Sequence, residues 1–192
     1  TALFGVQPDL VCLAKALGGG LPCGAIGGTA EVMSAITDGR YDQVGTFNGN
    51  PLTMAAARAV LTEVLTPDAY VRAEALGQRM MAQSMAALQA HGQPCYGSVY
   101  GFKGSVVFHG EPAQNYRDFL AIDTAVSHCH FLYQFNGGVF LPPWGKSESW
   151  TLSVAHTDAD GDCYSNNVAR LAADLEPIIE RSSDIFAAGV FN

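Results

Sequence analysis

The segment PDLVCLAKALGGGLPCGAIGG, residues 8–28, constrains the fold more than any other part of the sequence. An apolar run follows a Pro-Asp turn signal and ends at Lys15, so we predict that Pro8–Ala14 forms a short buried strand. The glycines after the lysine permit a tight turn. A second short strand is predicted over Cys23–Ile26. Lys15 therefore stands where a buried strand meets a glycine turn, an unusual place for a hydrated, flexible cation.

The other elements are predicted from helix caps and hydrophobic periodicity. They comprise a helix from Thr29 to Ile36, a loop from Thr37 to Pro51, a helix starting at Asn50-Pro51, another starting at Thr66-Pro67 and ending near His91, strands at Ser98–Phe102 and Gly104–Phe108, a helical stripe from Tyr116 to Tyr133, strands at Val139–Leu141 and Trp150–Val154, and a last helix starting at the capping-box-like Thr157-x-x-Asp160. Strand–helix material before residue 66 is thus followed by a compact α+β unit.

Composition excludes several kinds of partner. The chain has 192 residues, a net charge of −8 and only 15% charged residues. Without a basic patch, nucleic acid and anionic membranes are poor candidates, and no apolar run is long enough to span a bilayer. The five cysteines are scattered without a C-x-x-C pair, which favours a reduced, cytoplasmic setting. A surface this poor in charge favours an oligomer.

The local chemistry of Lys15 leaves two interpretations open. A lysine at the end of a buried strand, beside glycines that let a flat molecule approach, is suited to form a Schiff base with an aldehyde. The commoner interpretation is a loop lysine that reaches solvent. A phosphate-binding P-loop does not fit, because its glycines precede the lysine and a Ser or Thr follows it.

A second motif is VGTFNGNP, residues 44–51. The backbone N–H groups and hydroxyl of Gly45-Thr46 suit a small nest for phosphate. Taken alone, however, such a segment is more often an ordinary turn into a helix.

The two motifs together resemble the class III aminotransferases, pyridoxal 5'-phosphate (PLP) enzymes of fold type I, and within them the glutamate-1-semialdehyde aminomutase branch. The matching segments are PDLVCLAKALGGGLPCGAIGG and GTFNGNPLTMAAARAVL, and GVFLPPWGKSESWTLSVAHTDAD resembles the end of the small domain in that branch. The resemblance implies an α/β fold. Residues 1–66 would be the C-terminal part of the PLP-binding large domain. Residues 67–192 would be a C-terminal α+β small domain with a long connecting helix at about 67–91.

The resemblance also implies a function. Lys15 would form the Schiff base with PLP and later act as the acid–base group of a 1,3-proton shift. Gly45 and Thr46 would bind the PLP phosphate, with Thr46 reaching into the neighbouring subunit of a homodimer. The implied reaction transfers an amino group between a small amino compound and a carbonyl compound, or moves it within one molecule.

Other functions of the family fall on residues that have no match here. The aspartate that pairs with the pyridine nitrogen belongs to an N-terminal half, and Asp9 and Asp38 are better explained as turn residues. Arg40 and Arg58 are carboxylate-binding candidates only because they lie near the motifs. We therefore expect a truncated chain that is inactive alone. The alternative is a non-catalytic family member that acts as a structural or partner-binding domain.

The remaining candidates are weaker. His128-Cys129-His130 looks like a metal-binding cluster, but residues two apart on a helix point to different sides, so metal binding is not expected. His156 is expected at a strand end with a structural role. Trp144 and Trp150 flank a loop that could shape a pocket or pack in the core, and Phe47 could line the neighbouring subunit's site.

Overall fold

The computed structural model describes residues 2–142, 145–146 and 149–187. The chain divides into two compact units, Thr1–Thr66 and Pro67–Asn192, which we call unit 1 and unit 2. Trp144, one of the residues considered above, lies outside the described residues. Among the described residues, none of the helices combines the length and apolar character that crossing a bilayer requires.

Unit 1 is built on a two-stranded antiparallel ribbon of β1 (Leu10–Ala14) and β2 (Gly24–Gly28). Its helical elements are the 3₁₀ turns η1 (Ala2–Phe4) and η2 (Lys15–Gly18), the helices α1 (Ala30–Thr37) and α2 (Pro51–Ala59), and the π-helical turn η3 (Val60–Val64). Both caps follow the sequence prediction. The hydroxyl of Thr29 accepts the Val32 N–H at 3.4 Å, and Oδ1 of Asn50 accepts the N–H of Leu52 at 3.0 Å.

The prediction of a strand before Lys15 is confirmed, but the prediction that it is buried is wrong for this structure. Four of the five β1 residues are exposed, and Leu13 and Ile26 keep 53% and 49% of their surface accessible. A ribbon of two strands buries its apolar side chains only when another layer covers it. Within unit 1, the elements that contact the ribbon, α1 and η2, leave those side chains uncovered.

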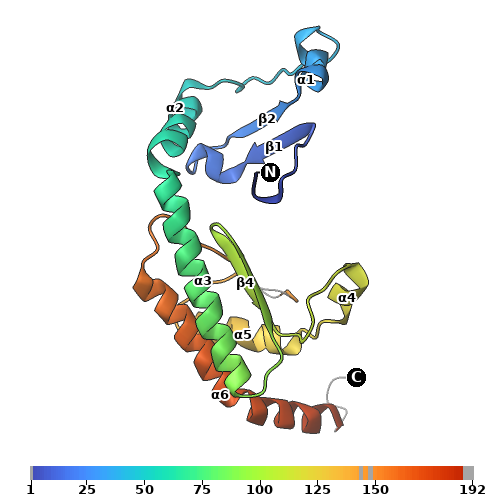
Figure 1. Ribbon diagram of the computed structural model, residues 1–192, viewed down its shortest axis with the longest axis vertical. Helices are drawn as coiled ribbons and strands as arrows, with labels where there is room; N and C mark the ends of the chain where they lie inside the picture. The colour runs from blue at the N-terminus through green and yellow to red at the C-terminus, as the bar shows by residue number, and fades with distance from the viewer. Residues whose placement is uncertain (1, 143–144, 147–148, 188–192) are drawn as a thin grey trace. The chain divides into compact units, whose positions relative to one another are not determined.

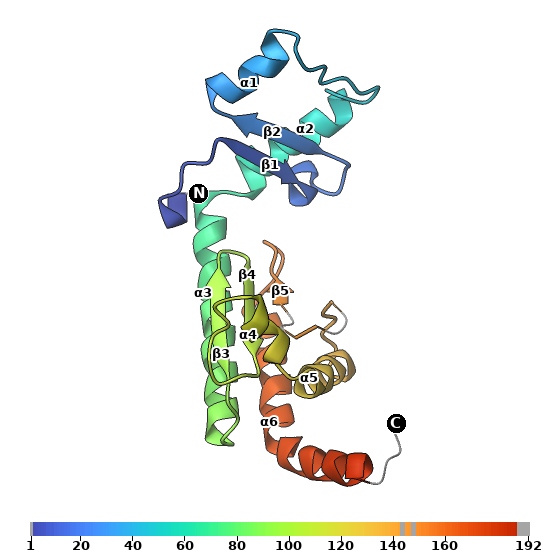
Figure 2. The same cartoon turned by 90° about the vertical axis from the view of Figure 1, so that its right-hand side faces the viewer.

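Unit 2 is a three-stranded antiparallel sheet flanked by helices, as Figures 1 and 2 show. The strands β3 (Tyr96–Tyr100), β4 (Lys103–Val107) and β5 (Ser149–Thr151) lie in the order β3-β4-β5. The helices are α3 (Pro67–Ala90), α4 (Tyr116–Ala121), α5 (Ala125–Asn136) and α6 (Asp158–Ala187). The helix α3 packs along β3 and β4 with α6 beside it, and α5 packs on α6. One hydrophobic core results, with Leu88, Val106, Val168, Leu171 and Leu175 at its centre.

Trp150 is the largest aromatic residue of this core, and a glycine on the neighbouring strand makes room for it. It lies opposite Gly104 on β4 and is 4% exposed. A Cβ on Gly104 would stand 2.7 Å from Cε2 of the indole, closer than real contacts allow. A Cβ on Gly77 of α3 would be in ordinary contact with Nε1, at 3.6 Å, and would crowd Cγ1 of Val99 at 3.0 Å instead. Gly104 therefore provides the slot for the indole.

Two predicted elements of unit 2 differ from the structure. The stripe from Tyr116 to Tyr133 is two helices, because Oδ1 of Asp123 accepts the Ala125 N–H at 2.8 Å and starts a new helix there. Residues 139–141, predicted as a strand, have no ladder partner among the described residues. The hairpin is confirmed, with bounds shifted so that Phe102 lies in its turn.

Candidate active site

Lys15 follows the last residue of β1 and has a strained backbone. Its φ of 58° makes it the one non-glycine with a left-handed conformation among the described residues, whereas Ala14 before it is extended. A side chain in this conformation costs about 1–2 kcal/mol because Cβ crowds the following carbonyl. Such strain gathers at functional sites, where the surrounding structure enforces it.

The glycines after Lys15 are required by close packing. Gly18 is buried, and a Cβ on it would stand 2.8 Å from Cβ of Cys23. Gly19 has a φ of 58°, and its Cβ would stand 2.7 Å from Cγ2 of Val60. The turn η2 therefore lies tightly against the start of β2 and against η3, which fixes where Lys15 leaves the strand.

The side chain of Lys15 is exposed. Within the part of the chain that the structure describes, its ammonium group has neither a hydrogen bond nor an ion pair. Lys146 differs, since its Nζ donates to the carbonyl oxygens of Leu120 and Ile122 at the end of α4. Within the described residues, the amine of Lys15 therefore takes no part in a stabilising hydrogen bond or ion pair.

Gly45 and Thr46 begin a turn that leads into α2. The Asn48 N–H donates to the Gly45 carbonyl at 3.0 Å, and the Asn50 N–H donates to the Phe47 carbonyl at 3.1 Å. Over the described residues, the backbone N–H groups of Gly45, Thr46 and Phe47 have no protein acceptor. Together with the Thr46 hydroxyl they form a donor group of the kind that binds phosphate.

The structure brings the two motifs to one hollow of about 470 Å³ in unit 1. Pro22, Cys23 and Gly24 line it from the first motif, and Phe47 and Asn48 are among the residues that line it from the second. Lys15 and Thr46 are not among the lining residues. The turn η2, which begins at Lys15, contacts α2, the helix that follows the turn containing Thr46. By their chemistry, the exposed amine of Lys15 and the N–H donors of the Gly45–Phe47 turn suit the aldehyde and the phosphate of PLP, so these residue types fit that cofactor.

Asn48 lies in the middle of the second motif, and its contacts with Gly45 and Gln43 are visible only in the structure. The available sequence clue was the dipeptide Asn48-Gly49, a common turn signal.

Of the carboxylates and arginines near the motifs, Asp38 and Arg40 are paired with each other. The Arg40 guanidinium donates to Ser34 Oγ at 2.8 Å and pairs with Asp38 at 3.2 Å. The backbone carbonyl of Asp9 accepts the Thr29 N–H at 3.0 Å, one position beyond the Leu10–Gly28 pair of the ribbon. Arg58 is exposed on α2. Local pairing of Arg40 leaves Arg58 as the freer of the two carboxylate-binding candidates.

The two histidines of α5 face different sides, as predicted. His128 is exposed, whereas His130 is fully buried between the rings of Phe108 and Tyr164. Among the described residues, no three His, Cys, Asp or Glu side chains gather in a way that could hold a metal ion.

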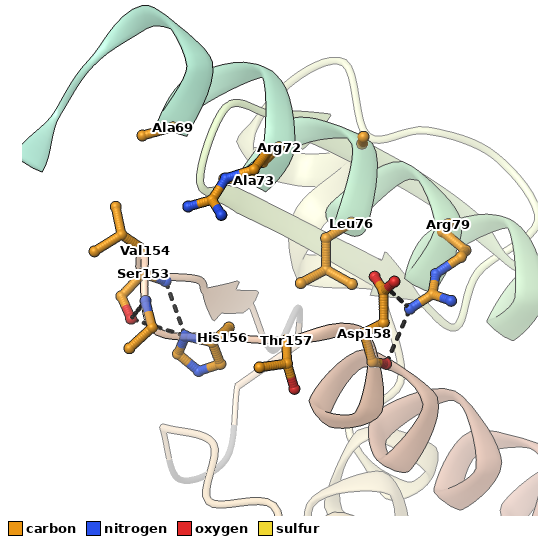
Figure 3. A pocket seen from close by; sticks show the side chains of 12 residues that line it. Ala69, Arg72, Ala73, Leu76, Arg79, Ser153, Val154, His156, Thr157 and Asp158 are labelled. Carbon is orange, nitrogen blue, oxygen red and sulfur yellow. Dashed lines mark hydrogen bonds and ion pairs between the residues drawn. The ribbon is translucent and has the colours of Figure 1, made fainter.

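His156 lies in unit 2 beside a hollow of about 540 Å³ between α3 and the start of α6 (Figure 3). Its Nδ1 accepts the Ser153 N–H at 2.9 Å and is the same distance from Ser153 Oγ. In the same place, the Thr157 N–H donates to Asp160 at 2.7 Å, and this hydrogen bond is the largest cause of a lowered pKa of that carboxyl. These contacts order the turn before α6 and support the expected structural role of His156.

Solved structures first define the class of fold. An omega-transaminase from Sphaerobacter thermophilus superposes with a TM-score of 0.81 at 32% identity, over 90% of this chain and 40% of that one. A glutamate-1-semialdehyde-aminomutase from Pseudomonas aeruginosa PAO1, in complex with PMP, gives a TM-score of 0.77 at 24% identity, over 91% of this chain and 41% of that one. The mixed α/β fold is therefore that of transaminases, and the predicted fold class is confirmed.

The family follows from the sequence. The family described as aminotransferase class-III matches residues 1–106, and this chain belongs to it. A curated relative, glutamate-1-semialdehyde 2,1-aminomutase 1 of Bacillus cereus (strain G9842), is 40% identical over 158 residues. That alignment covers 82% of this chain and 36% of the relative, so the chain spans about a third of the relative's length.

Proposed function

We propose that this chain is the lysine-bearing part of a PLP-dependent aminotransferase or aminomutase. Its substrates would be a small amino compound and a carbonyl compound, or one molecule that carries both groups. The observation that carries the proposal is the left-handed Lys15 at the end of β1, held by the packing of Gly18 and Gly19. Membership of the class III family and an amine without a structural task support it.

When bound, PLP supplies an aldehyde that condenses with amines and a ring that withdraws electrons from the neighbouring bonds. Lys15 would hold that aldehyde through its Nζ. The same Nζ, as a general base and then a general acid, would carry the proton that leaves a substrate carbon. The N–H groups of Thr46 and Phe47, with the Thr46 hydroxyl, bind the phosphate and orient the cofactor.

The proposal extends to a homodimer in which Thr46 serves the partner's site. Val44 and Phe47, on either side of the Gly45-Thr46 pair, are 85% and 80% exposed, which leaves large apolar side chains for a partner to cover. Light scattering should give twice the mass of one subunit for the whole protein that carries these residues.

Reductive labelling tests the role of Lys15. The protein is incubated with PLP, reduced with borohydride and digested, and the modified lysines are mapped by mass spectrometry. We expect stoichiometric label on Lys15 and little on Lys103 or Lys146. Lys103 is the matched control because it is also exposed.

The variant Lys15→Arg keeps the positive charge and removes the condensing amine. We expect it to lose the label and to lower turnover by roughly 10²–10⁴-fold, the usual contribution of an acid–base group. Equal labelling of the three lysines, or turnover that survives in Lys15→Arg, would remove Lys15 from the mechanism. A folded wild-type protein in which Lys15 takes up no label would favour the non-catalytic alternative.

A further inference from the structure

Asn48 lies at the third residue after Gly45, and every polar contact that it makes bears on the turn between them. Its N–H closes the turn on the Gly45 carbonyl at 3.0 Å. Its side-chain Nδ2 donates to the carbonyl of Gln43 at 3.3 Å, which ties the turn to the chain in front of it. Backbone and side chain of one residue thus fix the turn from two directions.

The side chain of Asn48 also occupies the space above Gly45. A Cβ on Gly45 would stand 2.8 Å from Oδ1 and 3.1 Å from Cγ of Asn48. The amide therefore takes the volume that any larger residue at position 45 would need. Because the backbone of Gly45 has no left-handed φ, a larger residue here is opposed by the Asn48 amide alone, which would have to move and give up its present position.

The far end of the turn is fixed independently. Gly49 has a φ of 68°, and Asn50 then caps α2 by accepting the N–H groups of Leu52 and Thr53 at 3.0 and 3.2 Å. The side-chain oxygen of Asn50 is used in capping α2, so Asn50 fixes the start of that helix. The conformation of residues 45–47 is left to Asn48.

We infer that Asn48 is a positioning residue for the phosphate of the cofactor. It holds the N–H groups of Gly45, Thr46 and Phe47 free of protein acceptors and directed to one anion, without touching that anion itself. This inference rests on the proposed function, because it assigns Asn48 to the phosphate end of the same site. Preorganised donors bind an anion more tightly than donors that must be ordered first.

The test compares PLP with pyridoxal, which has the same aldehyde and ring but no phosphate. Reductive labelling of Lys15 is titrated with each compound in the whole protein that carries these residues, for the wild type and for Asn48→Ala. We expect Asn48→Ala to raise the half-saturating concentration of PLP by about tenfold, because donors that must first be ordered bind the phosphate less tightly than donors already held in place. The titration with pyridoxal should change by less than about twofold, because no phosphate depends on the turn.

A second variant tests the contact above Gly45. Gly45→Ala should displace the Asn48 amide. It should therefore weaken the binding of PLP but not the binding of pyridoxal. In the Asn48→Ala background the same Gly45→Ala change should have a much smaller effect, since the clash is gone. This coupling would not arise if each residue affected folding separately.

The outcomes separate the two hypotheses. The positioning role would be overturned if Asn48→Ala left the half-saturating concentration of PLP unchanged, or raised those of PLP and pyridoxal equally. Either result would leave the proposed role of Lys15 intact. A wild-type protein that labels Lys15 with neither compound would refute the proposed function, and the inference with it.

Discussion

Unit 1 and unit 2 differ in how their elements are stabilised. Unit 2 has a hydrophobic core in which Leu88, Val168 and Leu171 are fully buried. In unit 1, the described side chains form no such cluster, and Ala57 and Gly18 are its buried residues. Unit 1 nevertheless carries Lys15 and the Gly45-Thr46 turn. The chemistry of the proposed site therefore lies in the unit whose local structure depends on caps, turns and close glycine contacts.

The largest expected effect comes from removing a core side chain of unit 2. Leu171→Ala should lower the free energy of unfolding by about 2–5 kcal/mol, because it deletes buried methyl groups and leaves a cavity. The matched variant Leu13→Ala in unit 1, where the leucine is 53% exposed, should cost less than about 1 kcal/mol.

Hydrogen exchange measures both variants, because it follows the amides of each unit separately and requires no two-state assumption for the chain. Similar losses for Leu171→Ala and Leu13→Ala would show that β1 is covered in the protein in solution, and would remove the contrast between the units.

A smaller change in the free energy of unfolding, and one that increases stability, is expected when glycine replaces the strained residue at position 15. Lys15→Gly relieves the left-handed conformation, and it should be more stable than Lys15→Ala by about 1 kcal/mol, measured by exchange of the β1 and β2 amides. The neighbouring Ala14 is extended, so Ala14→Gly should instead destabilise β1 by about 0.5–1 kcal/mol. Destabilisation by glycine at both positions would mean that Lys15 is not strained in solution.

The smallest effect concerns the turn before α6. The N–H and hydroxyl of Thr157 both donate to Asp160 and lower the pKa of its carboxyl. Because the folded pKa lies below the unfolded value of about 3.9, this contribution is present above that pH and is lost as the pH falls through the folded pKa.

Asp160→Asn should therefore be slightly less stable than the wild type at neutral pH, and the two should converge in acid. Urea unfolding followed by tryptophan fluorescence suits this test, because Trp144 and Trp150 both belong to unit 2. Asp68→Asn, in the first turn of α3, controls for the general effect of a charge near a helix start. If the difference in the free energy of unfolding between wild type and Asp160→Asn widened in acid, the stabilising role of the ionised Asp160 carboxylate would be contradicted.

Sequence patterns predicted what is determined locally. Thr29, Asn50 and the Thr157–Asp160 pair act within three residues of themselves, and all three helix starts are confirmed. Predictions that required knowledge of neighbours were less successful. Burial of Pro8–Ala14 depends on a covering layer, and the single helix from Tyr116 to Tyr133 fails because Asp123 hydrogen-bonds its own backbone.

For the site, the identities of Lys15, Gly45 and Thr46 could be proposed from two motifs and a family resemblance. The left-handed φ of Lys15 and the amide of Asn48 above Gly45 could not, because both arise from contacts between segments that the residue types alone do not specify.

The slot around Trp150 has a consequence for how this family member can vary. Because the indole lies where a side chain on Gly104 would be, a larger residue at 104 requires a smaller ring at 150. The two positions therefore constrain each other, and a substitution at either is expected to persist in evolution only when the other changes with it.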